Sequence, residues 1–181
     1  MSLEQRPHVL PDRVKTAIAV GKVPVVISDP SLPDTPLIYL NDAFSRMTGY
    51  AFDDAVGRNC RFLQPPEGAG PVVARVRAFL EDGEARHDRF VIPNQRRDGT
   101  PFLNLVYISK LRTGTGAQLF LGSQFDITSI TARSANAYDR ALAADLREIS
   151  SLTDAHGWSM LGSTSTLASS FETIVQAKLD G

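Results

Sequence analysis

The part of the chain after residue 86 constrains the fold most, because three strand-like runs follow one another there with only turn residues between them. The runs cover residues 89–94, 101–110 and 118–128. They are rich in β-branched and aromatic residues, which is typical of strands. Asp98-Gly99 separates the first two runs, and this dipeptide favours the positive φ angles of tight hairpin turns. Residues 113–116, Thr-Gly-Thr-Gly, provide the second connection. The sequence therefore predicts a three-stranded antiparallel meander.

Two shorter strands and several short helices precede the meander. Residues 23–28 and 37–41 are typical of strands, and the stretch rich in Pro and Asp between them indicates a hairpin turn. Short helices are expected over residues 41–64, the first capped by Asn41 or Asp42, and Pro71 opens a longer one. The pattern predicts an α+β fold, with a five-stranded antiparallel sheet and short helices on one face.

Helical segments flank the predicted core, which covers residues 23–128. Residues 1–22 contain a short helix that Asp12 can cap, and residues 129–181 contain two amphipathic helices. The apolar stripes of all three must bury against the domain or against another chain. The stripes are Val14, Ala17 and Ile18 in the first helix, Tyr138, Leu142, Leu146 and Ile149 in the second, and Leu167, Phe171, Ile174, Val175 and Leu179 in the third.

Composition and cysteine content exclude several classes of protein. The chain has 19 basic and 20 acidic residues, so no excess of positive charge favours nucleic acid or an anionic membrane surface. A single cysteine, Cys60, rules out an intrachain disulfide and a cysteine-based zinc site, and the three histidines lack the spacing of a metal site. The N-terminus lacks an apolar signal region, and no apolar stretch is long enough to span a bilayer. A soluble, cytoplasmic protein without a metal is expected.

The segment from Asn59 to Gln64 brings a thiol and two amides onto one short element. If it is helical, Cys60 and Gln64 share a face. The later strands add three uncharged amides, Asn94, Asn104 and Gln124. Amides offer both donors and acceptors, so a buried set of them suits a flat heterocycle with alternating carbonyl and N–H edges. The alternative is that these amides face solvent at strand edges.

This segment resembles the signature of the light-oxygen-voltage (LOV) domains, the flavin-binding photosensors of the PAS superfamily. The resemblance starts with Gly57-Arg58 and the run Asn59-Cys60-Arg61-Phe62-Leu63-Gln64. It covers roughly residues 23–128, the span of one small domain. The other matching segments, in family order, are Asp29-Pro30, Leu32-Pro33-Asp34, Ile38-Tyr39, Asn41-Asp42-Ala43-Phe44, Thr48-Gly49-Tyr50, Arg97-Asp98-Gly99, Asn104 and Phe120-Leu121-Gly122-Ser123-Gln124.

The resemblance implies a role for each candidate site residue. Cys60 would be the photoactive thiol that adds to the C4a atom of flavin mononucleotide (FMN). Arg61 and Arg77 would hold the FMN phosphate. The polar contacts to the flavin would come from Ser28, Asn59, Gln64, Asn94, Asn104 and Gln124. The apolar lining would come from Val26, Leu37, Leu63, Val73, Val76, Leu80, Val106, Ile108, Phe120 and Gly122. Ser28 stands where the family often has Thr, and Thr35 where it often has an amide.

The resemblance thus implies a blue-light photoreceptor that is not an enzyme and that forms a reversible cysteinyl-flavin adduct. No kinase, cyclase or DNA-binding segment is expected in the residues after Thr128, so it implies a "short LOV" protein. Output would then pass through the flanking helices, as a light-dependent homodimer or through an unidentified partner. Two alternatives remain from the residues: a flavin-dependent redox enzyme and a flavin-free PAS interaction module.

Overall fold

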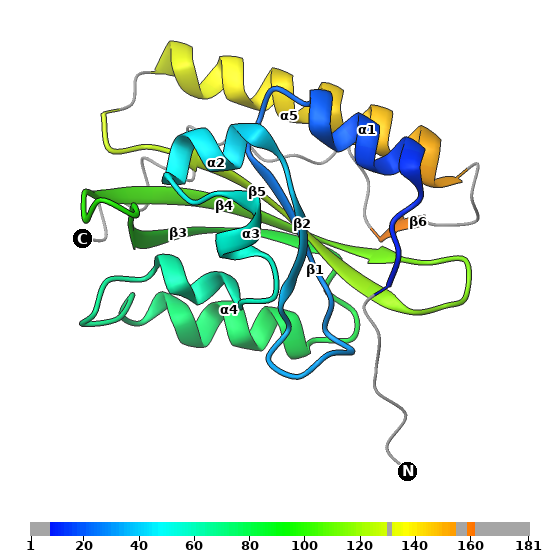
Figure 1. The fold of residues 1–181 in the computed structure, drawn as a ribbon, viewed down its shortest axis with the longest axis horizontal. Helices are drawn as coiled ribbons and strands as arrows, with labels where there is room; N and C mark the ends of the chain where they lie inside the picture. Colours follow the sequence, from blue (N-terminus) through cyan, green and yellow to red (C-terminus); the bar gives the residue numbers. More distant parts are fainter. Residues whose placement is uncertain (1–7, 130–131, 155–158, 162–181) are drawn as a thin grey trace.

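The computed structural model describes residues 8–129, 132–154 and 159–161 and is built around an antiparallel sheet (Figure 1). Five strands of the sheet follow one another in the order β2-β1-β5-β4-β3, and a sixth short strand, β6 (Ser159–Leu161), pairs with β4. The five-stranded antiparallel core with its helices confirms the predicted fold class. The bounds of the five strands are Val25–Ser28 (β1), Leu37–Leu40 (β2), His87–Gln95 (β3), Pro101–Arg112 (β4) and Gln118–Asp126 (β5).

Tight turns set the register of the meander where the sequence predicted them. Gly99 has a φ of 88°, and the Arg96 N–H donates to the Thr100 carbonyl at 2.9 Å to close the β3–β4 hairpin. Gly116 has a φ of 85° in the β4–β5 turn, where Thr113 N–H donates to the Ala117 carbonyl at 2.7 Å. Glycine adopts these φ angles without the steric cost that a Cβ atom adds.

Short helices on the inner side of the sheet follow β2. They are α2 (Asp42–Thr48), α3 (Phe52–Ala55), the 3-10 helix η1 (Cys60–Leu63) and α4 (Val72–Glu81). Asn41 caps α2 by accepting from the Phe44 N–H at 3.1 Å, and Gly49 ends it with a φ of 80°. The Asn41 amide also donates to the carbonyls of Ile18 and Val23, so the cap joins α2 to the N-terminal segment.

Two flanking helices, α1 (Asp12–Val20) and α5 (Ala132–Asp154), cover the outer face of the sheet (Figure 1). The predicted stripes on both helices are buried in the main core, together with outer-face residues such as Ile27, Leu105 and Leu121. These two stripes therefore bury against the domain itself. The expectation that Asp12 caps α1 is wrong: the helix begins at Asp12, the residue before it is Pro11, and no side chain caps it.

The C-terminal extension differs in part from the expectation. After α5, residues Ser159–Leu161 form a short strand, β6, that pairs with Lys110–Arg112 of β4. This strand lies between the two stripes that the sequence assigned to helices, where no strand was predicted. The second predicted stripe, from Leu167 to Leu179, lies outside the described residues. Among the helices that the structure describes, none is long and apolar enough to cross a membrane.

Candidate flavin site

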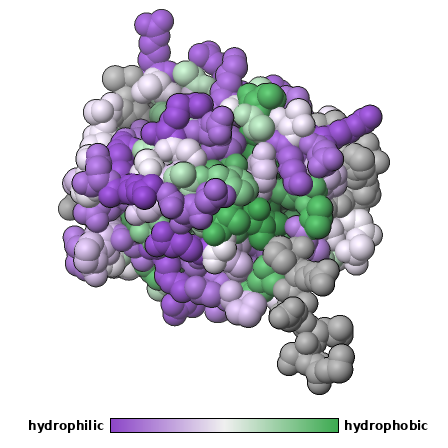
Figure 2. All heavy atoms as spheres, in the orientation of Figure 1, coloured by the Kyte–Doolittle hydropathy of each residue, from purple (hydrophilic) through white to green (hydrophobic). Residues whose placement is uncertain are grey.

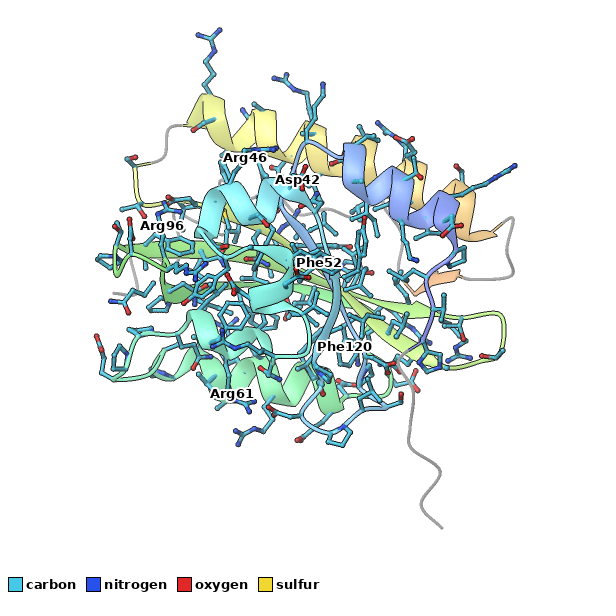
Figure 3. All side chains as sticks on the ribbon, viewed as in Figure 1. Asp42, Arg46, Phe52, Arg61, Arg96 and Phe120 are labelled. Atoms are coloured by element: carbon cyan, nitrogen blue, oxygen red, sulfur yellow. The ribbon has the colours of Figure 1, made fainter. Side chains whose placement is uncertain are left out.

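A cavity lies between the inner face of the sheet and the helices η1 and α4. Each of the strands β1 to β5 contributes side chains to it. Successive side chains of a strand point to opposite faces, so alternate residues of each strand line the cavity. Figure 3 shows Arg61 and Phe120 on the side of the sheet that α4 covers. The cavity is lined by Val26, Ser28, Thr35, Leu37, Asn59, Cys60, Arg61, Gln64, Val76, Leu80, Ile92, Asn94, Asn104, Val106, Ile108, Phe120, Gly122 and Gln124.

The middle of the cavity floor is apolar where β1 and β5 pair. Val26 of β1 lies opposite Gly122 of β5, which in turn lies opposite Ile108 of β4. A Cβ atom at position 122 would meet the Cγ2 atom of Val26 at 3.1 Å, which is tighter than an ordinary contact. Gly122 is therefore the residue that keeps this part of the cavity open.

Three amide side chains form a chain of hydrogen bonds along the floor. The Asn104 Nδ2 group donates to Asn94 Oδ1 at 2.8 Å and to Gln124 Oε1 at 3.2 Å. All three residues are buried, with exposed fractions of 5%, 1% and 1% for Asn94, Asn104 and Gln124. The alternative that they face solvent is therefore wrong.

Gln124 keeps one hydrogen-bonding group without a partner. Its Nε2 atom is buried and has no hydrogen bond within the described residues. A buried donor without a partner is costly, so its presence in a cavity indicates a ligand with an acceptor. Together with the amides beside it, this donor fits the polar edge of a flavin ring.

Cys60 begins η1, and Asn59 caps this helix by accepting from the Arg61 N–H at 3.0 Å. Burial raises the pKa of the Cys60 thiol from 9.0 to about 12. The sulfur is therefore protonated at neutral pH, so the form of Cys60 that reacts is the thiol and not the thiolate. A neutral thiol suits a reaction in which an excited ring, rather than a thiolate, supplies the driving force.

The β1–β2 loop lies at the edge of the cavity and contacts η1. The Asn59 amide donates to the Asp34 carbonyl at 2.6 Å, and Arg61 Nη2 lies 2.5 Å from Asp34 Oδ2. Arg61 is half exposed, and it is the one charged side chain among the described residues that line the cavity.

The structure brings together most of the predicted site residues but not all of them. Leu63 packs in a neighbouring apolar cluster with Leu37 and Phe44. Val73 and Arg77 do not line the cavity, and Arg77 is exposed. Because one residue rotates a helix by about 100°, Arg77 lies on the flank of α4, beside the face that Val76 and Leu80 turn toward the cavity.

Two cavity residues were absent from the predicted set. Ile92 precedes Asn94 by two residues on β3, so the alternation of that strand could have identified it. Thr35 lies in the β1–β2 loop, where no periodic pattern exists. The described residues contain no cluster of His, Cys, Asp or Glu that could hold a metal ion.

Comparison with known proteins identifies the family. The sequence profile of the PAS domain matches residues 22–129, so the chain belongs to the PAS family. The chain is 43% identical over 129 residues to blue-light-activated histidine kinase 1 of Erythrobacter litoralis (strain HTCC2594); this match covers 70% of the chain and 35% of the kinase. The crystal structure of the Rhodobacter sphaeroides LOV protein aligns with a TM-score of 0.69 and 30% identity, over 76% of this chain and 80% of that one. Within the PAS family, the chain is a LOV domain.

A third comparison extends beyond isolated sensor domains. An RNA-binding LOV receptor aligns with a TM-score of 0.59 and 28% identity, over 85% of this chain and 42% of that one. The chain spans about a third or less of the curated relatives that it matches. The family assignment therefore concerns the sensor domain, and the activities named for the longer relatives belong to those proteins.

Proposed function

We propose that this chain is a blue-light photoreceptor that binds FMN and forms a reversible covalent bond between the Cys60 sulfur and C4a of the flavin ring. The observation that carries the proposal is a single neutral thiol on a cavity whose floor holds three buried amides and one donor without a partner. The names of the relatives, which include blue-light-activated kinases and a phototropin, support light as the input.

Each residue of the cavity has a limited task in this proposal. A bound flavin supplies the absorption of blue light and the ring carbon that accepts sulfur. Cys60 contributes its S–H group, whose proton passes to N5 as the sulfur bonds to carbon. Asn94, Asn104 and Gln124 hold the polar edge of the ring, and Arg61 pairs with the phosphate.

We further propose that output leaves through β5 and α5. Gln124 faces the cavity, and Ser123, the residue before it, faces the other side of the sheet. There the Ser123 hydroxyl lies 2.7 Å from the Tyr138 hydroxyl of α5. An amide that rotates when its ring partner changes from acceptor to donor would alter this strand. The chain acts as a sensor without enzymatic activity of its own, and the proposed readout is a light-dependent homodimer.

Absorbance of the purified chain tests the proposal. The dark protein should show structured blue absorption that bleaches in light and returns in darkness. Cys60→Ala should retain flavin and the dark spectrum but lose the reversible bleach. Protein that reconstitutes no flavin would instead support an interaction module, and stable flavin reduction that requires a nucleotide donor would support a redox enzyme.

A further inference from the structure

An ion pair lies at the edge of the cavity, and it involves a residue to which the proposed function gives no role. Asp34 forms an ion pair with Arg61 at 2.5 Å, and both side chains are more than half exposed, at 55% and 56%. An exposed ion pair of this kind contributes little to folding stability. The effect of the pair on Arg61 is therefore of more interest than its effect on the fold.

The backbone holds Asp34 in this position at a cost. Asp34 and Thr35 have φ angles of 67° and 48°, and they are the non-glycine residues with positive φ in the described part of the chain. A β-branched residue such as Thr rarely adopts this conformation. The Asn59 amide donates to the Asp34 carbonyl at 2.6 Å and Thr35 N–H donates to the Leu32 carbonyl at 3.1 Å, so the strained loop is fixed to η1 and to itself. Such strain is common where a loop clamps a ligand site.

We propose that Asp34 sets how strongly the site prefers phosphorylated flavins to riboflavin, because it competes with the flavin phosphate for Arg61. The inference rests on the proposed flavin site. Riboflavin has no phosphate, so it leaves the pair between Arg61 and Asp34 intact. A flavin phosphate carries about −1.5 to −2 charges, as phosphate monoesters do, and must share the Arg61 guanidinium with the Asp34 carboxylate. Arg61 is the one charged side chain among the described residues that line the cavity, and it is the side chain that Asp34 pairs with.

The competition gives Asp34 an effect opposite to that of Arg61. Arg61 raises the affinity for FMN relative to riboflavin, and Asp34 lowers it. At an exposed site the interaction is screened by solvent and salt. We therefore expect removal of the Asp34 charge to raise the ratio of FMN affinity to riboflavin affinity by about 3- to 10-fold at low salt. The change should shrink as the salt concentration rises.

The test compares the affinities of the flavin-free chain for FMN and for riboflavin, measured by quenching of flavin fluorescence. Asp34→Asn is the appropriate variant, because Asn tolerates positive φ as well as Asp and keeps the carbonyl that Asn59 contacts. Asp54→Asn is the matched control: its partner Arg97 is also 56% exposed, but neither residue lines the cavity. The control should leave the ratio unchanged.

A second background separates competition for Arg61 from simple repulsion. Arg61→Gln should lower the ratio, and Asp34→Asn added to it should then change the ratio by less than about 2-fold, because no guanidinium remains to compete for. An unchanged ratio in Asp34→Asn, or an equal rise with and without Arg61, would overturn the inference. Apoprotein that binds neither flavin would overturn the proposed function as well, so the two failures are distinguishable.

Discussion

At the scale of single residues, the absence of a side chain at Gly122 is as important to the site as the thiol of Cys60. Position 122 of β5 lies opposite Val26, and a Cβ atom there would meet the Cγ2 atom of Val26 at 3.1 Å. We expect Gly122→Ala to lower flavin affinity by about 10-fold or more, because the added methyl group and Val26 compete for one space. The measurement is flavin occupancy and affinity of the refolded variant.

Gly83→Ala is the control for this substitution. Gly83 has no atom within 4 Å of the position that a Cβ would occupy, and its φ is not in the left-handed range. The Gly83→Ala variant should bind flavin with the same affinity as the unsubstituted chain. Equal affinity in both variants would show that Gly122 does not limit the cavity.

Alternation along the strands made most of the candidate site predictable. Val26, Asn104, Val106, Gly122 and Gln124 all face the cavity, because their strands alternate strictly and the hairpin turns fix their register. Positions without such a constraint were harder to predict. Thr35 lies in a strained loop, and Arg77 lies on α4, where the rotation of the helix about its axis depends on packing.

At the scale of elements, Gln124 is the candidate link between cavity and strand. Its Oε1 atom accepts from Asn104, and its Nε2 atom has no partner within the described residues. Gln124→Leu removes both groups at similar size. We expect the variant to keep the light-induced bleach but to lose most of the change in shape or oligomeric state, as measured by X-ray scattering in darkness and light.

Gln118→Leu provides a control on the same strand. Gln118 is half-buried at the start of β5 and does not line the cavity. The Gln118→Leu substitution should leave the response to light intact. A full response in Gln124→Leu would remove Gln124 from the signalling path.

The contact between β5 and α5 is the next link. Tyr138 is buried, its hydroxyl lies 2.7 Å from the Ser123 hydroxyl, and its ring stacks on Phe125 with centroids 4.3 Å apart. Tyr138→Phe keeps the ring and removes the hydrogen bond. We expect the free energy of unfolding to fall by about 1–2 kcal/mol, because a buried Ser hydroxyl loses its partner. Denaturant unfolding measures this loss, and hydrogen exchange should show faster opening of α5.

Tyr39→Phe offers the comparison for that prediction. The Tyr39 hydroxyl donates to the Lys15 carbonyl at 3.3 Å from a half-buried position, so its removal should cost less. Equal losses in the two variants would argue against a special role for the contact between Ser123 and Tyr138. α5 has a further tether in Asp145, which accepts from Lys22 N–H at 2.9 Å and Val23 N–H at 3.2 Å.

Elements with a strong periodic signal were predicted well, and weak ones were not. The stripe from Tyr138 to Ile149 identified α5 because its apolar side chains recur at helical spacing over several turns. β6 has only three residues, and it pairs with β4. A segment this short has no periodic pattern of its own, so its strand conformation depends on a tertiary contact that its sequence does not reveal.

At the scale of the whole molecule, the covered sheet changes how a dimer can form. The outer face of the sheet is already buried beneath α1 and α5, so a second copy would have to meet the outside of these helices or another surface. Figure 2 shows an apolar area on one face over β2 and α3, where Phe52 is 42% exposed and packs edge-on against Tyr39. Some apolar surface therefore remains for association.

We expect a homodimer whose affinity changes with light by about 5- to 150-fold, which corresponds to a coupling of about 1–3 kcal/mol. Such a shift is visible when the protein concentration lies near the dissociation constant. Size-exclusion chromatography with light scattering, over a concentration series in darkness and in light, measures it. Identical monomer fractions under both conditions would contradict a dimer-based output and would favour a separate partner.

The most direct measurement of the central claim uses the fact that Cys60 is the only cysteine in the chain. The infrared S–H stretching band of the flavin-loaded protein therefore belongs to one atom. We predict that this band disappears on illumination and returns in darkness at the rate at which the blue absorbance recovers. A band that persists while the blue absorbance bleaches would contradict bond formation between Cys60 and the flavin.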